Sequence, residues 1–207
     1  GADTGWPFRL SMLVVTLGGI FIISTLIGLL TSGIEAKLDN LSKGRSVVIE
    51  RDHTVILGWS QQIFTIVSEI IEANANKSRA CIVILSDREK VDMEDDLAAR
   101  ITERKSTKIV CRSGSSIDLN DLSMVSLDTA RSIIVLAPES DKSDTRVIQT
   151  ILAITNNPAR RKAPYHIVAE LDNPKSVEVA RMVGQNEVEL ILAGDLIARI
   201  IAQTCRQ

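Results

Sequence analysis

The stretch "HTVILGWSQQIFTIVSEI", residues 53–70, decides the fold of this chain. A short apolar run leads into one glycine, Gly58, and is followed by Ile63, Ile66 and Val67 at helical spacing. Nucleotide-binding domains place their phosphate loop at such a strand–turn–helix unit, and some hydrolases place their nucleophilic serine there. The stretch has only one of the glycines that either site requires, which raises the question of what this turn does.

The pattern after His53 alternates between apolar runs and segments with helical spacing. Continuous apolar runs are typical of parallel strands that are buried on both faces. This alternation predicts an α/β fold with a Rossmann-like, doubly wound parallel sheet. The connection over residues 112–130 looks irregular, with room for one short helix. We expect the strands at residues 54–58, 80–86, 108–111, 132–137, 166–170 and 188–192.

An uncharged segment precedes this domain. No residue from Leu10 to Ile34 carries a charge, and a helix needs about 20 apolar residues to cross a bilayer. The segment therefore predicts one transmembrane helix, and a buried helix of a soluble protein is the alternative. A signal peptide is disfavoured because the segment is too long and lacks a basic start. The basic flank places everything after Ile34 in the cytosol; it comprises Lys37, Lys43, Arg45 and Arg51, against Arg9 alone on the other side.

Composition excludes several classes of partner. The formal charge is −2 and aromatic residues make up 3% of the 207 residues, so neither a basic face nor stacking platforms for nucleic acid are expected. The three cysteines, Cys81, Cys111 and Cys205, form no CxxC pair. We interpret them as free thiols in a reducing compartment rather than disulfide partners or zinc ligands.

Two chemical interpretations of the turn fall short of their motifs. A dinucleotide site needs G-x-G-x-x-G, and Ser60 and Ile63 replace the second and third glycines, so nucleotide binding is weakened. Asp87, at the end of the second strand, could hold a ribose hydroxyl, but we favour a helix cap. A nucleophile elbow needs G-x-S-x-G, and the last glycine is absent here. His53 and His166 both open apolar strands, which leaves a serine hydrolase without a base, and we expect no enzyme.

The remaining interpretation is that the turn has a purely architectural role and binds no ligand. Longer segments elsewhere in the sequence favour this interpretation. The segments "VILGWS" (55–60), "CRSGSSIDLNDL" (111–122), "SIIVLAPESDKSDT" (132–145) and "HIVAELDNPKSVEVARMVG" (166–184) resemble the RCK domain, the regulator of potassium conductance of ligand-gated cation channels. The segments "ITNNPARRKAPYHIVAE" (154–170) and "LIARIIAQTCRQ" (196–207) are similar to sequences of the CASTOR/POLLUX family of ion channels. The resemblance extends from Ala2 to Gln207.

The resemblance implies a division of the chain into four parts: 1–9 as the end of a pore loop and selectivity filter, 10–34 as an inner pore helix, 35–50 as a linker and 51–207 as the RCK domain. It also leads us to expect further pore helices upstream and a further RCK lobe downstream. The filter would consist of Ala2, Asp3, Thr4 and Gly5, which differ from the TVGYG of potassium channels. A ring of Asp3 carboxylates would favour cations, calcium included.

A pore requires several copies of one inner helix, so we expect a homo-tetramer in the lipid bilayer that conducts cations. Gly18 and Gly19 are candidates for a gating hinge, because small residues allow a membrane helix to bend. Ordinary use of glycine in membrane helices is the alternative explanation.

Three carboxylates are candidates for a metal site. Asp144 lies in the first turn of the helix after the fourth strand, and Glu170 and Asp172 end the fifth strand two residues apart. We expect them to converge at the carboxyl edge of the sheet, where such oxygen ligands suit Ca²⁺ or Mg²⁺. The resemblance implies the same positions as acidic calcium ligands of calcium-gated RCK channels. Alternatively, Asp144 stabilises the N-terminus of its helix and Asp172 precedes the start of the next helix at Asn173-Pro174. The metal site would then lie elsewhere, for example in "DMEDD" (92–96).

The sequence thus favours a subunit of a ligand-gated cation channel whose cytosolic RCK domain binds Ca²⁺ and gates the pore, with no nucleotide cofactor. Two alternatives share the fold: a nucleotide-binding (NAD or ATP) regulatory subunit of a potassium transport system, and a membrane-anchored NAD-dependent oxidoreductase. The sequence does not distinguish K⁺, Na⁺ and Ca²⁺ as the permeant ion.

Overall fold

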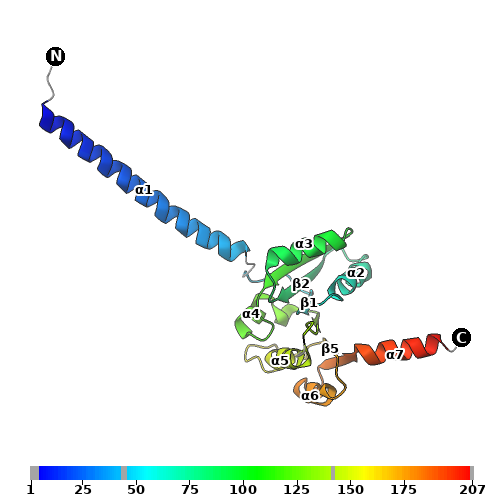
Figure 1. Ribbon diagram of the computed structural model, residues 1–207. Helices are drawn as coiled ribbons and strands as arrows, with labels where there is room; N and C mark the ends of the chain where they lie inside the picture. The colour runs from blue at the N-terminus through cyan, green and yellow to red at the C-terminus, as the bar shows by residue number, and fades with distance from the viewer. Residues whose placement is uncertain (1–4, 43–45, 141–142, 206–207) are drawn as a thin grey trace. The chain divides into compact units, whose positions relative to one another are not determined.

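The computed structural model describes residues 5–42, 46–140 and 143–205, and the chain forms two compact units, Gly1–Ser42 and Lys43–Gln207 (Figure 1). The first unit contains one helix, α1 (Trp6–Ser42). Its first turn begins where the Gly5 carbonyl oxygen accepts a hydrogen bond from the Phe8 N–H at 2.9 Å. Within α1, Trp6–Thr31 has the length and composition to cross a membrane. The helix therefore starts before residue 10 and continues into the segment expected to be a linker.

The second unit is built on a six-stranded sheet. Its strands are β1 (Thr54–Leu57), β2 (Ala80–Ser86), β3 (Thr107–Ser113), β4 (Ser132–Val135), β5 (Ile167–Leu171) and β6 (Val188–Leu192). All neighbours pair in parallel, in the order β3-β2-β1-β4-β5-β6, which is the doubly wound order of Rossmann folds. The predicted fold class is confirmed. Because β1 pairs with both β2 and β4, the strand order reverses beside β1.

Helices cover both faces of this sheet. The helices of this unit are α2 (Ile63–Ala73), α3 (Lys90–Arg100), α4 (Leu119–Met124), the 3₁₀ helix η1 (Leu127–Thr129), α5 (Ser143–Thr155), α6 (Ser176–Val183) and α7 (Ala193–Thr204). Of these, α7 has no buried residue and extends away from the sheet (Figure 1). α4 and η1 occupy the connection that was expected to be irregular with one short helix. Residues of α2 and α3 pack with Ile56 in one buried cluster, whereas residues of α4, α5 and α6 pack with Val55 and Leu57 in another. The side chains of β1 alternate between the two cores, as continuous apolar strands of a parallel sheet do.

The segment that enters the sheet domain is hydrogen-bonded to the α4–η1 region. The Val48 side chain is buried, and its N–H donates to the Met124 carbonyl oxygen at 2.7 Å. The Ser126 hydroxyl donates to the Val48 carbonyl oxygen at 2.6 Å, and the Asp52 N–H donates to the Thr129 carbonyl oxygen at 2.9 Å. Residues 46–52 are therefore an integral part of the domain.

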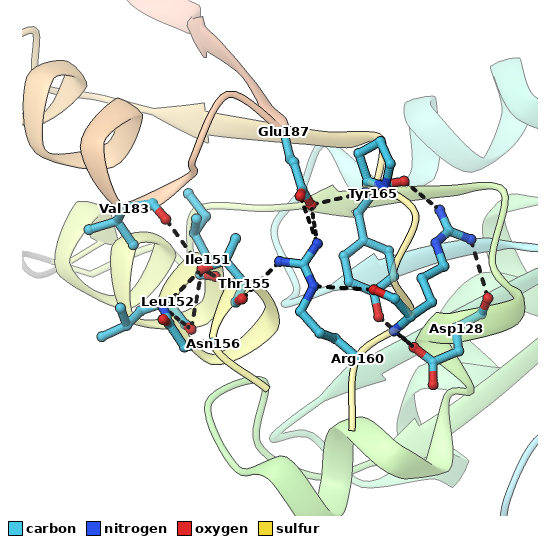
Figure 2. Close-up of polar contacts among 11 residues, drawn as sticks. Asp128, Ile151, Leu152, Thr155, Asn156, Arg160, Tyr165, Val183 and Glu187 are labelled. Atoms are coloured by element: carbon cyan, nitrogen blue, oxygen red, sulfur yellow. Dashed lines mark hydrogen bonds and ion pairs between the residues drawn. The ribbon is translucent and has the colours of Figure 1, made fainter. Parts of the chain in front are cut away.

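A polar network fixes the connection between α5 and β5 (Figure 2). Arg160 is ion-paired with Glu187, whose carboxylate also accepts the Tyr165 N–H at 2.9 Å. The Tyr165 hydroxyl and the Arg161 N–H both donate to Asp128 Oδ1, at 2.5 and 3.0 Å. The guanidinium carbons of Arg160 and Arg161 lie 5.1 and 4.7 Å from the centre of the Tyr165 ring. The network connects η1 to the residue before β6 through one buried tyrosine.

Candidate functional site

Gly58 makes the turn between β1 and α2 possible. Its φ is +95°, a conformation that favours glycine, and a Cβ at this position would lie 2.8 Å from the Leu136 carbonyl oxygen. The close approach of the turn to the chain after β4 therefore requires the glycine, which gives it an architectural role.

A cavity of about 210 Å³ lies beside this turn, where the strand order reverses. It is lined by Gly58, Asp87, Arg88 and Arg146, among others. Arg146 from α5 is ion-paired with Asp87, which follows β2. The guanidinium carbon of Arg88 lies 4.8 Å from the centre of the Trp59 ring, while its Nη1 donates to Asp96 at 2.8 Å. The cavity is thus crossed by side chains of the protein itself.

The expectation that Asp87 caps the following helix is wrong. The residue at the N-cap of α3 is Glu89, and it makes no capping bond with its side chain. The Arg88 N–H is instead bound by the Ser86 hydroxyl at 3.3 Å. Asp87 is engaged by Arg146, because α5 carries that guanidinium across the sheet edge.

The N-terminal end of α2 is also occupied. The Gln61 N–H, in the turn before α2, donates to Glu139 Oε1 at 3.1 Å, so a carboxylate from the β4–α5 loop lies where a phosphate would bind. Ser60 is almost fully buried, and Ile63 is completely buried in the core beneath α2. Both positions of the missing glycines are therefore filled by side chains packed into the domain.

Asp144 and Asp172 lie together at the carboxyl edge. The Asp144 carboxylate accepts the N–H groups of Asp172 and Asn173 at 2.8 and 3.0 Å, and Asp172 Oδ2 accepts the Ser143 hydroxyl at 2.7 Å. Burial raises the pKa of Asp144, but hydrogen bonds from the Ser176 side chain and from these two backbone groups outweigh it and leave the pKa below its ordinary value. Asp144 is thus ionised and joins α5 to the β5–α6 loop.

Glu170 points to the other face of the sheet. The alternate residues Ala169 and Leu171 pack in the core that contains α5, so Glu170 faces α2, where Gln62 Nε2 donates to its Oε1 at 2.7 Å. It lines an apolar groove of about 550 Å³ between α2 and α7. Its Oε2 is buried and has no hydrogen-bond partner among the described residues.

The three predicted metal ligands therefore do not converge in this conformation. Asp144 and Asp172 are adjacent and Glu170 is on the opposite face, because β5 places alternate residues on alternate faces. Within residues 5–42, 46–140 and 143–205, no group of three or more His, Cys, Asp or Glu side chains is arranged to hold a metal ion.

The two histidines have structural positions, as expected. His53 is fully buried, with Nε2 2.9 Å from the Val125 carbonyl oxygen. His166 precedes β5, and its carbonyl oxygen accepts the Ile133 N–H at 2.9 Å. The cysteines are free thiols, and burial raises the pKa of Cys81 to about 11 and that of Cys111 to about 12.

The predicted pore residues are only partly described. Gly5 precedes α1, and Gly18 and Gly19 lie within the continuous helix, where an added Cβ would meet nothing within 4 Å. The hydroxyls of Thr16 and Thr25 donate to carbonyl oxygens one turn earlier, at 2.8 Å, so these polar groups are satisfied inside an apolar helix. Outside the described residues lie Ala2, Asp3 and Thr4.

Comparisons with known proteins agree with this fold. Residues 50–176 match the family described as "Calcium-activated potassium channel slowpoke-like RCK domain". The structure described as "GsuK channel bound to NAD" aligns with 91% of this chain and 31% of its own, with a TM-score of 0.50 and 22% identity. The human SLO3 gating ring aligns with 74% of this chain and 26% of its own, with a TM-score of 0.51 and 20% identity. At these identities the structures support the fold alone.

Curated relatives extend the match to nearly the whole chain. "Probable ion channel CASTOR" of Oryza sativa subsp. japonica is 38% identical over 98% of this chain, and "Ion channel CASTOR" of Lotus japonicus is 36% identical over 96%. "Probable ion channel POLLUX" of Arabidopsis thaliana is 33% identical over 96%. This chain spans 23%, 23% and 24% of their respective lengths. The resemblance to CASTOR and POLLUX is confirmed, and with the match over residues 50–176 the chain belongs to the slowpoke-like RCK domain family.

Proposed function

We propose that this chain is part of a subunit of a ligand-gated cation channel, with α1 as the inner pore helix and the RCK domain as its cytosolic regulator. The names of the curated relatives as ion channels support this, as does the candidate span Trp6–Thr31. The observation that carries the proposal is the covalent arrangement. Only residues 43–45 separate the end of α1 from the hydrogen-bonded segment 46–52, so a movement of the domain reaches the helix through a short length of chain.

The proposed channel is a homo-tetramer, because a single helix per subunit must be repeated to enclose a path for cations. The exposed apolar side chains of α7 support assembly, since large apolar surfaces of this kind mark sites of protein contact; they are Leu196, Ile197, Ile200 and Ile201, each 52–58% exposed. We place Asp3 at the outer mouth of the pore. Gly18 and Gly19 are the proposed hinge, since they are adjacent glycines in α1 at which an added Cβ would meet nothing within 4 Å.

The ligand that we propose is Ca²⁺, held by the carboxylates of Asp144 and Asp172. The Asp144 carboxylate accepts two backbone N–H groups, and the hydroxyls of Ser143 and Ser176, which also bond to it, place two neutral oxygen atoms beside the carboxylates. Oxygen donors of this type fit Ca²⁺ and, less well, Mg²⁺. We leave Glu170 out of this site because its carboxylate is bound to Gln62 on the other face.

The two carboxylates come from different elements, which gives the site a way to act on the domain. Asp144 belongs to α5 and Asp172 to the loop between β5 and α6. Ion binding would favour whichever domain conformation holds α5 and this loop at the shortest separation. The resulting shift of the domain is what we propose to pull on α1.

Electrophysiology of the full-length protein in planar bilayers tests this function. With K⁺ on both sides, Ca²⁺ added on the side of the RCK domain should raise the open probability. Asp172→Asn should raise the Ca²⁺ concentration for half-activation by about tenfold, or about 1.4 kcal/mol of binding free energy. Glu189→Gln, which removes an exposed carboxylate from β6, serves as the charge-matched control and should leave the response unchanged. The absence of a cation current would overturn the channel proposal, whereas an unchanged response in Asp172→Asn would overturn the calcium site.

A further inference from the structure

The reversal of strand order beside β1 is the place where doubly wound sheets bind dinucleotides. Such binding uses a free N–H at the start of the first helix for the pyrophosphate and an acidic side chain after the second strand for the ribose. Solved structures with this fold are described as GsuK bound to NAD and as GsuK bound to ADP. In this chain α2 and Asp87 hold the corresponding positions.

The position of the pyrophosphate is already filled by an anion. Glu139 Oε1 accepts the Gln61 N–H at 3.1 Å, so the backbone donor that precedes α2 is engaged by a carboxylate of the same chain. A phosphate at this point would lie beside a second negative charge, and the two like charges repel each other. Ser60 and Ile63 also fill the positions where glycines would let a pyrophosphate and the helix approach.

The position of the ribose is filled as well. Asp87 is paired with the Arg146 guanidinium, which also lies 3.5 Å from the Ser115 hydroxyl. A ribose hydroxyl would have to displace a cation from this carboxylate. Arg88 covers the Trp59 ring, and the remaining cavity of about 210 Å³ is below the roughly 300–1,000 Å³ of ordinary ligand sites.

We propose that Glu139 and the Asp87–Arg146 pair form an internal latch that takes the place of a dinucleotide and closes this cleft to nucleotides. Glu139 joins the β4–α5 loop to the turn after β1, and Arg146 joins α5 to the loop after β2. In a nucleotide-binding domain, a bound dinucleotide would instead bridge these loops at the point where the strand order reverses. The two halves of the sheet are therefore held together at their carboxyl edge without a ligand.

Nucleotide titration of the purified full-length protein tests the closed cleft. Isothermal titration calorimetry with ADP and with NAD should give no saturable binding at millimolar concentrations. The proposal is overturned if wild-type protein binds either nucleotide with a Kd in the micromolar range, and a tenfold loss of that binding in Arg146→Ala would identify Arg146 as a nucleotide ligand.

Amide hydrogen exchange tests the latch independently of nucleotides. Arg146→Ala and Glu139→Ala should each raise exchange rates at least tenfold in the β2–α3 and β4–α5 loops, and Arg146→Ala should lower the Tm. Arg199→Ala breaks an exposed ion pair with Asp195 on α7 and is the matched control, expected to leave both loops unchanged. Exchange in these loops that is the same in Arg146→Ala, Glu139→Ala and wild type would overturn the latch.

Discussion

Arg160 and Glu187 form an ion pair in which Nη2 of the arginine lies 2.6 and 2.8 Å from the two carboxylate oxygens, with side chains 20% and 14% exposed. A third bond runs from Arg160 Nη1 to the Thr155 carbonyl oxygen at 2.8 Å. The pair therefore joins the end of α5 to the residue before β6.

Breaking this pair should destabilise the RCK domain. Arg160→Ala leaves the largely buried Glu187 carboxylate without this cation, which should cost roughly 2–4 kcal/mol of unfolding free energy. Urea denaturation followed by the fluorescence of Trp59 measures the loss. Arg199→Ala breaks a pair whose side chains are 74% and 51% exposed and should cost less than about 0.5 kcal/mol. Equal losses in the two variants would contradict the role assigned to the network.

Any side chain introduced at Gly58, in the turn after β1, should destabilise the domain. Gly58→Ala combines a φ of +95° with a Cβ 2.8 Å from the Leu136 carbonyl oxygen, and we expect a loss of roughly 1–3 kcal/mol. Gly194→Ala is the control, because its Cβ would meet nothing within 4 Å and alanine favours a helix by about 0.5–1 kcal/mol. A midpoint of urea unfolding that is unchanged in Gly58→Ala would show that the turn relaxes freely.

The cysteines should differ sharply in reactivity. Burial raises the pKa of Cys81 to about 11 and that of Cys111 to about 12, so few thiolates form near pH 8, while Cys205 is exposed. Brief treatment of the native protein with iodoacetamide should label Cys205 first, as read by peptide mass spectrometry. Denatured protein, the control, should be labelled at all three positions. Early labelling of Cys111 would mean that the core opens more readily than its packing indicates.

Asp144 should give the domain a dependence on acid pH. Its pKa is lowered in the folded state, so its stabilising effect is present above the unfolded pKa of about 3.9 and is lost as pH falls through the folded pKa. With a calcium chelator present, Asp144→Asn should lose about 1–2 kcal/mol at pH 7 and should lose less than wild type on further acidification. Unfolding midpoints measured from pH 7 to pH 2.5 check this. Parallel curves for the two proteins would contradict it.

The fold was predictable because six continuous apolar runs leave few arrangements other than a buried parallel sheet. The position of Glu170 was not predicted correctly. The two-residue spacing from Asp172 implies a shared face only while the strand continues, and β5 ends at Leu171. Glu139 and Arg146 belong to no recognisable motif, since their importance arises from loops brought together by the strand order. The sequence therefore indicated the carboxyl edge as the candidate site without revealing which charges meet there.

Calcium titration by isothermal calorimetry tests the central claim most directly, because it reports binding at Asp144 and Asp172 without requiring channel opening. Wild-type full-length protein should bind Ca²⁺ saturably. Asp172→Asn should weaken binding by about tenfold, or about 1.4 kcal/mol, while Glu170→Gln and Glu189→Gln should bind as wild type does. Binding that is unchanged in Asp172→Asn, or weakened only in Glu170→Gln, would contradict the account.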